Sequence, residues 1–115
     1  EVYHLPEATA VAVQQARARG SRVVAVGTTS CRTLETCATD ERTVTAESGS
    51  SELFLYPGRE FRVVDALLTN FHLPQSTLLM LVAAFAGHQE TLALYREAIA
   101  ERYRFYSFGD AMLLL

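Results

Sequence analysis

The sequence predicts an α/β fold in which a mixed sheet is flanked by helices. The first observation is the order of patterns over residues 6–38, where a helix, an apolar β-branched run, a turn and a second helix follow one another. This order is typical of layered α/β proteins. The second observation is that 50% of the 115 residues are hydrophobic, which is enough for one domain with a real core.

Local patterns predict the first two elements. Residues 1–5 alternate like a strand that needs partners. A helix is expected from Pro6 to about Arg19, with Gly20 ending it. Its expected apolar stripe consists of Ala8, Val11, Ala12 and Ala16.

A strand, a turn and a second helix come next. Residues 22–26 form a short apolar run rich in β-branched side chains, which predicts a buried strand. Residues 27–30 form the turn, and Ser30 is the expected N-cap of a helix over 31–38. Residues 40–51 are polar, with a glycine and three serines, and predict a loop.

The rest of the chain predicts short strands and two more helices. Strands are expected at 53–56 and 61–64, around a Pro-Gly turn, whereas residues 65–71 fit either a strand or a loop. The later elements are a buried helix over 76–86 that stops at Gly87, a helix over 89–103, and an apolar strand over 111–115. The residues expected to face inward from the longer helix are Leu92, Tyr95, Ala98, Ile99 and Tyr103.

Composition and charge argue against several classes of function. The net charge is -3, all ten basic residues are Arg, and no long basic run occurs, so charge alone indicates no nucleic-acid surface. The longest apolar run, residues 78–87, is too short to span a bilayer. The histidines and cysteines lack the spacing of a metal site, so no metal is expected.

The two cysteines are expected to stay reduced. If Cys31 and Cys37 share one helix, they lie about 240° apart around its axis, on different faces. They would therefore neither pair with each other nor share a metal ion. Two cysteines in a chain without a signal peptide fit a reducing cytoplasm, and we expect a cytoplasmic protein.

The segment 61–87 contains the most unusual polar residues of the chain. Asp65, Thr69, Asn70 and His72 lie in an otherwise apolar run, where each polar group costs free energy unless it is hydrogen-bonded. The segment is thus either a satisfied piece of core or the wall of a site. In a strand, Arg62 would point away from Asp65, so we expect Asp65 to find a more distant donor.

Three further groups of residues are candidates for binding. Thr28, Thr29 and Ser30 can present backbone amides and hydroxyls to an anion at a helix N-terminus, or simply form a tight capped turn. Ser76 is a helix cap by default, and an anion site otherwise. Residues 103–110 place four aromatic residues around one Arg, which suits either core packing or the stacking of a base.

Four blocks in order carry a resemblance to a known family. They are GTTSCRTLE at 27–35, LFLYPG at 53–58, FRVVDALLTNFHLPQSTLLMLVAAFAG at 61–87 and YRFYSFGDAML at 103–113. Together they resemble the carboxy-terminal part of S-adenosylmethionine:tRNA ribosyltransferase-isomerases, enzymes of the queuosine pathway. The resemblance covers essentially the whole chain.

The resemblance implies a tRNA-modifying reaction without a metal. S-adenosylmethionine, a co-substrate rather than a true cofactor, gives its ribose to 7-aminomethyl-7-deazaguanine at the tRNA wobble position. Isomerisation yields epoxyqueuosine, and adenine and methionine leave. Our hypothesis is that Asp65 and His72 share the acid/base steps and that Asn70 orients one of them. The expected substrate-binding residues are Thr28, Thr29, Ser30, Thr69, Ser76, Arg104, Tyr106 and Asp110.

Members of this family are much longer than this chain. The resemblance therefore implies that residues 1–115 are the carboxy-terminal part of a larger α/β catalytic domain, without the amino-terminal part and an inserted β-barrel domain. We expect the segment alone to be inactive. We also expect its terminal strands, 1–5 and 111–115, to lack neighbours, which would lower its stability. Two alternatives are an S-adenosylmethionine-dependent methyltransferase and a non-catalytic α/β scaffold, in which Asp65, Asn70 and His72 would all be hydrogen-bonded in a dry core.

Overall fold

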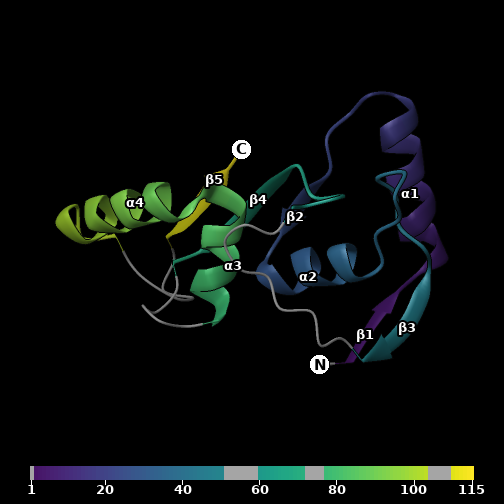
Figure 1. Cartoon of the computed structure of the whole chain (residues 1–115), viewed down its shortest axis with the longest axis horizontal. Helices are drawn as coiled ribbons and strands as arrows, with labels where there is room; N and C mark the ends of the chain where they lie inside the picture. The colour runs from purple at the N-terminus through teal and green to yellow at the C-terminus, as the bar shows by residue number, and fades with distance from the viewer. Residues whose placement is uncertain (1, 51–59, 72–76, 104–109) are drawn as a thin grey trace.

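The computed structural model describes residues 2–50, 60–71, 77–103 and 110–115. In chain order the elements are β1 (Val2–Leu5), α1 (Glu7–Ala18), β2 (Val24–Val26), α2 (Thr28–Thr36), β3 (Glu47–Ser50), β4 (Ala66–Asn70), α3 (Thr77–Ala86), α4 (His88–Ala100) and β5 (Ala111–Leu114). Figure 1 shows α4, α3 and β5 at one end of the molecule and α1 with β1 and β3 at the other. The α/β class is confirmed.

The larger sheet is mixed, as predicted. Its strand order is β2-β4-β5, with β2 parallel to β4 and β5 antiparallel to β4. In the register, Ala25 lies beside Leu67, and Leu67 lies beside Leu114. The final strand therefore has a neighbour, and the expectation that it would lack one is wrong.

The smaller sheet is an antiparallel pair of β1 and β3 at the other end of the molecule (Figure 1). Leu5 pairs with Glu47 and Val2 with Ser50, so the first strand also finds its partner within the chain. Sequence patterns missed β3, which lies in the predicted loop over 40–51. Its four residues are all exposed, so no apolar alternation marks it as a strand.

The core consists of two clusters of buried side chains. The first packs one face of the larger sheet against α2, α3 and α4, and its members include Ala25, Cys31, Leu67, Leu81, Val82, Tyr95, Ala98, Met112 and Leu114. The second joins α1 to β1 and to the segments before β2, β3 and β4, and it consists of Leu5, Ala10, Val13, Ala16, Val23, Cys37, Val44 and Val63. The helices thus fix β4, the strand that leads to the candidate site.

Two helices bury only part of the apolar stripe predicted for them. Helix α1 buries Ala16 as predicted, together with Ala10 and Val13, while Val11 is 39% exposed. On α4, Tyr95 and Ala98 are buried as predicted, but Ile99 is 64% exposed. The expectations for Ala8, Ala12, Leu92 and Tyr103 are likewise wrong, since all four are exposed.

Strand assignments also differ in two places. Residues 61–64 are not a strand, and the ambiguous segment after them forms β4. Strand β2 is not buried as a whole, because only Ala25 is covered while Val24 and Val26 are 50% and 64% exposed. The predicted strand at 53–56 lies outside the described residues.

Helix α3 ends at Ala86 as expected, before Gly87. In the part of the chain that the structure describes, no helix has the length and apolar character needed to cross a membrane.

Both cysteines are free and buried, so the prediction that they do not pair is confirmed. Burial raises the pKa of Cys31 to about 12, with the Glu35 carboxylate adding to the effect. Burial also raises the pKa of Cys37 to about 11, helped by a hydrogen bond to Glu47. Since only the thiolate is nucleophilic, both thiols are inert in the folded chain.

We therefore expect alkylation to report on unfolding. At pH 8, iodoacetamide should label Cys31 on the order of 1,000-fold more slowly in native protein than in urea-unfolded protein, from the difference in thiolate fraction alone. Mass spectrometry of quenched samples measures this ratio for each cysteine. Rapid native labelling of Cys31 would show that its thiol is not buried.

Candidate functional site

The candidate site lies at the edge of the larger sheet where β2 and β4 both end. Because these strands are parallel, their carboxyl ends meet at one edge, and the Gly27 amide donates to the Leu68 carbonyl at 2.8 Å. Helix α2 begins directly after β2, and β4 ends at Asn70. Ligands of open α/β sheets bind at this kind of edge.

Helix α2 begins three residues earlier than predicted. Its N-cap is Gly27, whose φ of 92° is costly for residues with a side chain. Ser30 is therefore not the cap, and Thr28, Thr29 and Ser30 form the first helical turn. The first amides of a helix lack intrahelical acceptors and carry partial positive charge. The exposed Thr29 and Ser30 place this turn at the surface.

Asn70 and Asp110 lie together at the same edge. The exposed Asn70 side chain donates through Nδ2 to the Asp110 carbonyl at 3.3 Å, and Asn70 is the register partner of Ala111. This contact ties the end of β4 to the start of β5. Thr69, by contrast, is 6% exposed, so its side chain lies on the covered face of the sheet rather than in the open edge.

Asp65 lies at the other end of β4. The strand spans five residues, so Asp65 and Asn70 are about 16 Å apart at 3.3 Å per residue. Its carboxylate accepts hydrogen bonds from Arg17 Nη1 at 2.8 Å, the Val23 amide at 2.8 Å and Arg42 Nη2 at 3.0 Å. The expectation of a distant donor is confirmed. At this separation Asn70 does not contact Asp65, which leaves His72 as the residue that Asn70 would orient in the hypothesis.

The partners of Asp65 change its acidity. Burial by itself would raise its pKa, but the hydrogen bond from the Val23 amide and the two guanidinium groups outweigh it, and the pKa is lowered. Arg17 is itself held in place, because its Nε donates to the Arg42 carbonyl at 2.8 Å and Nη2 donates to the Val63 carbonyl. A carboxylate held in this way is a weak base and a strong structural link.

Glu35 is a buried carboxylate that sequence patterns did not single out. It is 4% exposed on the last turn of α2 and accepts hydrogen bonds from the amides of Arg62, Val63 and Val64 at 2.8, 2.8 and 2.9 Å. One available signal was its place four residues after the buried Cys31, on the same side of the helix. Glu35 fixes the segment that leads into β4.

Four of the predicted site residues lie outside the described residues, namely His72, Ser76, Arg104 and Tyr106. Their roles stay predictions. Within residues 2–50, 60–71, 77–103 and 110–115, no three His, Cys, Asp or Glu side chains gather as the ligands of a metal ion would.

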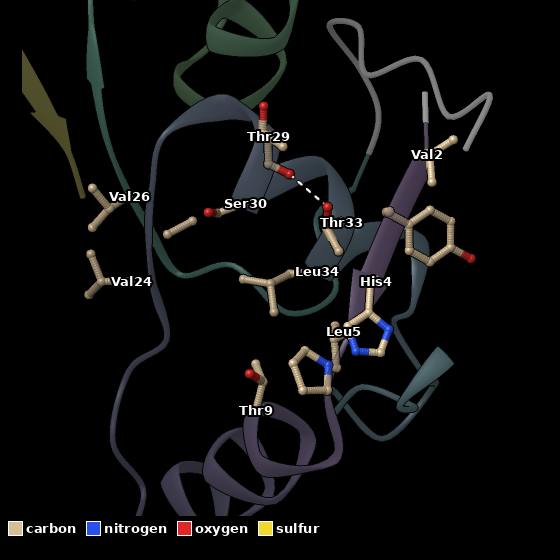
Figure 2. A pocket seen from close by; sticks show the side chains of 13 residues that line it. Val2, His4, Leu5, Thr9, Val24, Val26, Thr29, Ser30, Thr33 and Leu34 are labelled. Carbon is tan, nitrogen blue, oxygen red and sulfur yellow. Dashed lines mark hydrogen bonds between the residues drawn. The ribbon is translucent and has the colours of Figure 1, made fainter. Parts of the chain in front are cut away.

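A cavity of about 580 Å³ lies beside β2 (Figure 2). Its walls come from β1, β2, α2 and the start of α1, and Thr29 and Ser30 contribute to it from the first turn of α2. Thr33 lines it too, but its hydroxyl already donates to the Thr29 carbonyl at 2.9 Å. Among the described residues that line it, none is Asp, Glu, Lys or Arg, and the ionisable side chains are the His4 imidazole and the Tyr3 phenol.

Comparisons with known proteins agree on one family. A family model described as queuosine biosynthesis protein matches residues 1–114. S-adenosylmethionine:tRNA ribosyltransferase-isomerases from Natranaerobius thermophilus and Gloeobacter violaceus are 60% and 58% identical over 99% and 100% of this chain. The chain covers 33% of the length of each, about a third of these curated relatives.

A solved structure gives the same result for the fold. The crystal structure of S-adenosylmethionine tRNA ribosyltransferase from Thermotoga maritima matches 99% of this chain with a TM-score of 0.90 and 55% identity. The match covers 40% of that chain.

Proposed function

This chain belongs to the queuosine biosynthesis protein family, and from that premise we propose that it forms part of an S-adenosylmethionine:tRNA ribosyltransferase-isomerase. The observation that carries the proposal is the match of residues 1–114 to the family together with 60% identity to a relative of that name. The proposed reaction moves the ribosyl group of S-adenosylmethionine to 7-aminomethyl-7-deazaguanine in tRNA and releases adenine and methionine. The proposed place is the cytoplasm, and the proposed domain is the carboxy-terminal part of the α/β catalytic domain.

In this proposal the edge formed by β2 and β4 holds substrate. The first turn of α2 suits an anionic group, either the carboxylate of the methionine moiety or a tRNA phosphate, because the first amides of a helix lack intrahelical acceptors and carry partial positive charge. Asn70 lies at the same edge, exposed and linked to the Asp110 backbone. Ser76, Arg104 and Tyr106 follow these positions in the chain and complete the proposed binding set, with Arg104 and Tyr106 against adenine or the wobble base.

His72 is the first candidate for the acid/base steps. Protons beside a sulfonium are acidified, so one base can start the reaction, and adenine leaves more easily when a donor protonates it. His72 follows Asn70 by two residues, which favours Asn70 as the group that orients it. Asp65 was expected to share this duty. Its position at the far end of β4 and its three donors favour a structural part.

Adenine release from the full-length polypeptide tests the proposal. With S-adenosylmethionine and tRNA carrying the aminomethyl-deazaguanine base, Asn70→Ala should lower kcat about 100-fold with little change in folding, and His72→Ala should lower it by about 100-fold or more. Glu97→Gln, on the exposed side of α4, is the matched control and should leave kcat unchanged. Near-normal turnover in both site variants would remove these residues from the mechanism.

The same assay separates the alternatives. A methyltransferase would release S-adenosylhomocysteine instead of adenine. A scaffold would release neither, and its requirement that Asn70 lie in a dry core does not fit the exposed side chain. The 115-residue segment alone should be inactive, and adenine release by it would overturn the proposal that the remaining two thirds of the polypeptide are needed.

A further inference from the structure

Five arginines lie on three segments that meet at Asp65, at the end of β4 opposite to the candidate site. They are Arg17, Arg19, Arg22, Arg42 and Arg62. Arg17 Nη1 and Arg42 Nη2 donate to the Asp65 carboxylate at 2.8 and 3.0 Å. The amide of Val23, the residue after Arg22, donates to the same carboxylate at 2.8 Å. Residues 17–23, the turn over 39–43 and residues 62–65 are thus held together around one acid.

The exposed charge of these segments is positive. Arg17 and Asp65, whose side chains are 19% and 17% exposed, neutralise each other. The other four arginines are exposed, and the same segments add only two exposed carboxylates, those of Asp40 and Glu41. The net charge of the whole chain, -3, did not indicate this surface, because its arginines are far apart along the sequence. We call it the arginine face, and it consists of Arg19, Arg22, Arg42 and Arg62.

The arginine face can bind an external anion. Among the residues that the structure describes, the ion pairs are made by other arginines, and Arg19 and Arg22 take part in none. Arg62 pairs with Asp40 at 3.2 Å, but their side chains are 54% and 95% exposed, and such surface pairs contribute little stability. A phosphate can therefore replace Asp40. Guanidinium groups also match the geometry of phosphate oxygens and bind them in a bidentate manner.

The turn over 39–43 is fixed before any ligand binds. The Thr39 amide donates to the Thr43 carbonyl at 2.8 Å and closes the turn. Arg42 has a φ of 64°, a conformation that costs free energy for a residue with a side chain. Its carbonyl accepts from Arg17 Nε at 2.8 Å and its side chain binds Asp65, so both ends of the residue are held. A binding group fixed in advance loses less entropy when its partner arrives.

We propose that the arginine face binds the phosphate backbone of tRNA. The inference rests on the proposed function and adds to it a surface that contacts the tRNA away from the modified base. Asp65 and Asn70 are about 16 Å apart along β4, so the face and the candidate site are separate. A nucleic-acid strand carries a phosphate every few ångströms, so a tRNA whose target base lies at the Asn70 edge can also reach this face, unlike one small anion.

Salt-dependent tRNA binding by the full-length polypeptide tests the inference. A triple variant, Arg19→Gln with Arg22→Gln and Arg62→Gln, removes three charges and leaves the contacts of Asp65 in place. At low salt it should bind tRNA at least about 10-fold more weakly, and the slope of log Kd against log salt concentration should fall by about 2. Fluorescence anisotropy of labelled tRNA at several salt concentrations measures both quantities.

Two further variants separate charge from structure. Arg96→Gln, on the exposed side of α4, is the matched control and should keep the wild-type affinity and slope. Lysine at the three positions of the triple variant keeps the charge and should restore most of the affinity. Weak binding by the lysine variant as well would show that a structural change, and not the lost charge, weakens the complex, and this would overturn the inference.

Adenine release distinguishes this inference from the proposed function. In the glutamine triple variant, the KM for tRNA should rise about 10-fold, while the KM for S-adenosylmethionine and kcat at saturating tRNA stay normal. If wild type releases adenine and the triple variant binds tRNA as Arg96→Gln does, the inference alone is overturned. If wild type binds tRNA through these arginines and releases no adenine, the proposed reaction alone is overturned. A wild type that binds no tRNA would overturn both.

Discussion

Replacing Asp65 with alanine is expected to lower the free energy of unfolding by about 3 kcal/mol, since it leaves two guanidinium groups and one backbone amide without their acceptor. Arg17 is the more important partner, because its side chain is 19% exposed whereas that of Arg42 is 50% exposed. The exposed pair contributes less, since water screens it. Urea denaturation of the full-length polypeptide measures the effect.

The variant Asp65→Asn distinguishes a structural role of Asp65 from a catalytic one. Asparagine keeps the shape and can still accept from the Val23 amide and one guanidinium, so most of the fold should survive at low temperature. If the part is structural, turnover per folded molecule stays near normal in Asp65→Asn. A folded Asp65→Asn protein with adenine release reduced by orders of magnitude would instead restore the acid/base hypothesis for this residue.

The lowered pKa of Asp65 also sets a pH dependence. A carboxyl whose pKa is lower in the folded state adds stability that is present above its unfolded pKa of about 3.9 and lost as the pH falls through the folded value. Wild type and Asp65→Asn should therefore differ fully at pH 7 and converge below about pH 4. A difference that stays constant down to pH 2 would show that the charge of Asp65 is not what stabilises the fold.

Sequence patterns predicted the elements that local signals define. Gly20 and Gly87 both adopt positive φ, at 72° and 98°, and the helices before them end where these glycines predict. The buried face of α1 was harder to predict than its ends, because Ala and Val occur on several sides of that helix. The buried side of α1 also carries Arg17, and a charged residue at that position interrupts the apolar pattern in the sequence. In the fold, Asp65 forms an ion pair with Arg17.

The errors in the site come from contacts between distant residues. Residues 62–64 look like a strand, yet their amides donate to a carboxylate about 28 residues earlier in the chain instead of to a neighbouring strand. Asp65 and Asn70 are close in sequence, but β4 separates them by its full length. That the start of α2 and the end of β4 lie at the same end of the sheet could be expected only once β2 and β4 were known to be parallel.

Glu35 is expected to be the second strongly stabilising carboxylate. An acidic side chain in the last turn of a helix is disfavoured by the helix dipole, so its presence there needs compensation. Three consecutive amides supply that compensation, and all three lose their acceptor in Glu35→Ala. At about 1 kcal/mol or more for each unsatisfied buried amide, the free energy of unfolding should fall by at least about 3 kcal/mol.

Glutamine at this position tests whether both oxygens are needed. The amide of Glu35→Gln can replace only one oxygen, and its NH₂ group would face the amide of Arg62 or those of Val63 and Val64. Its loss of stability should fall between those of wild type and Glu35→Ala, by urea denaturation of the full-length polypeptide. Glu97→Ala, on the exposed side of α4, is the control and should stay within about 0.5 kcal/mol of wild type. A free energy of unfolding for Glu35→Ala equal to that of the control would mean that the three amides find other acceptors. In that case α2 would not fix the segment before β4.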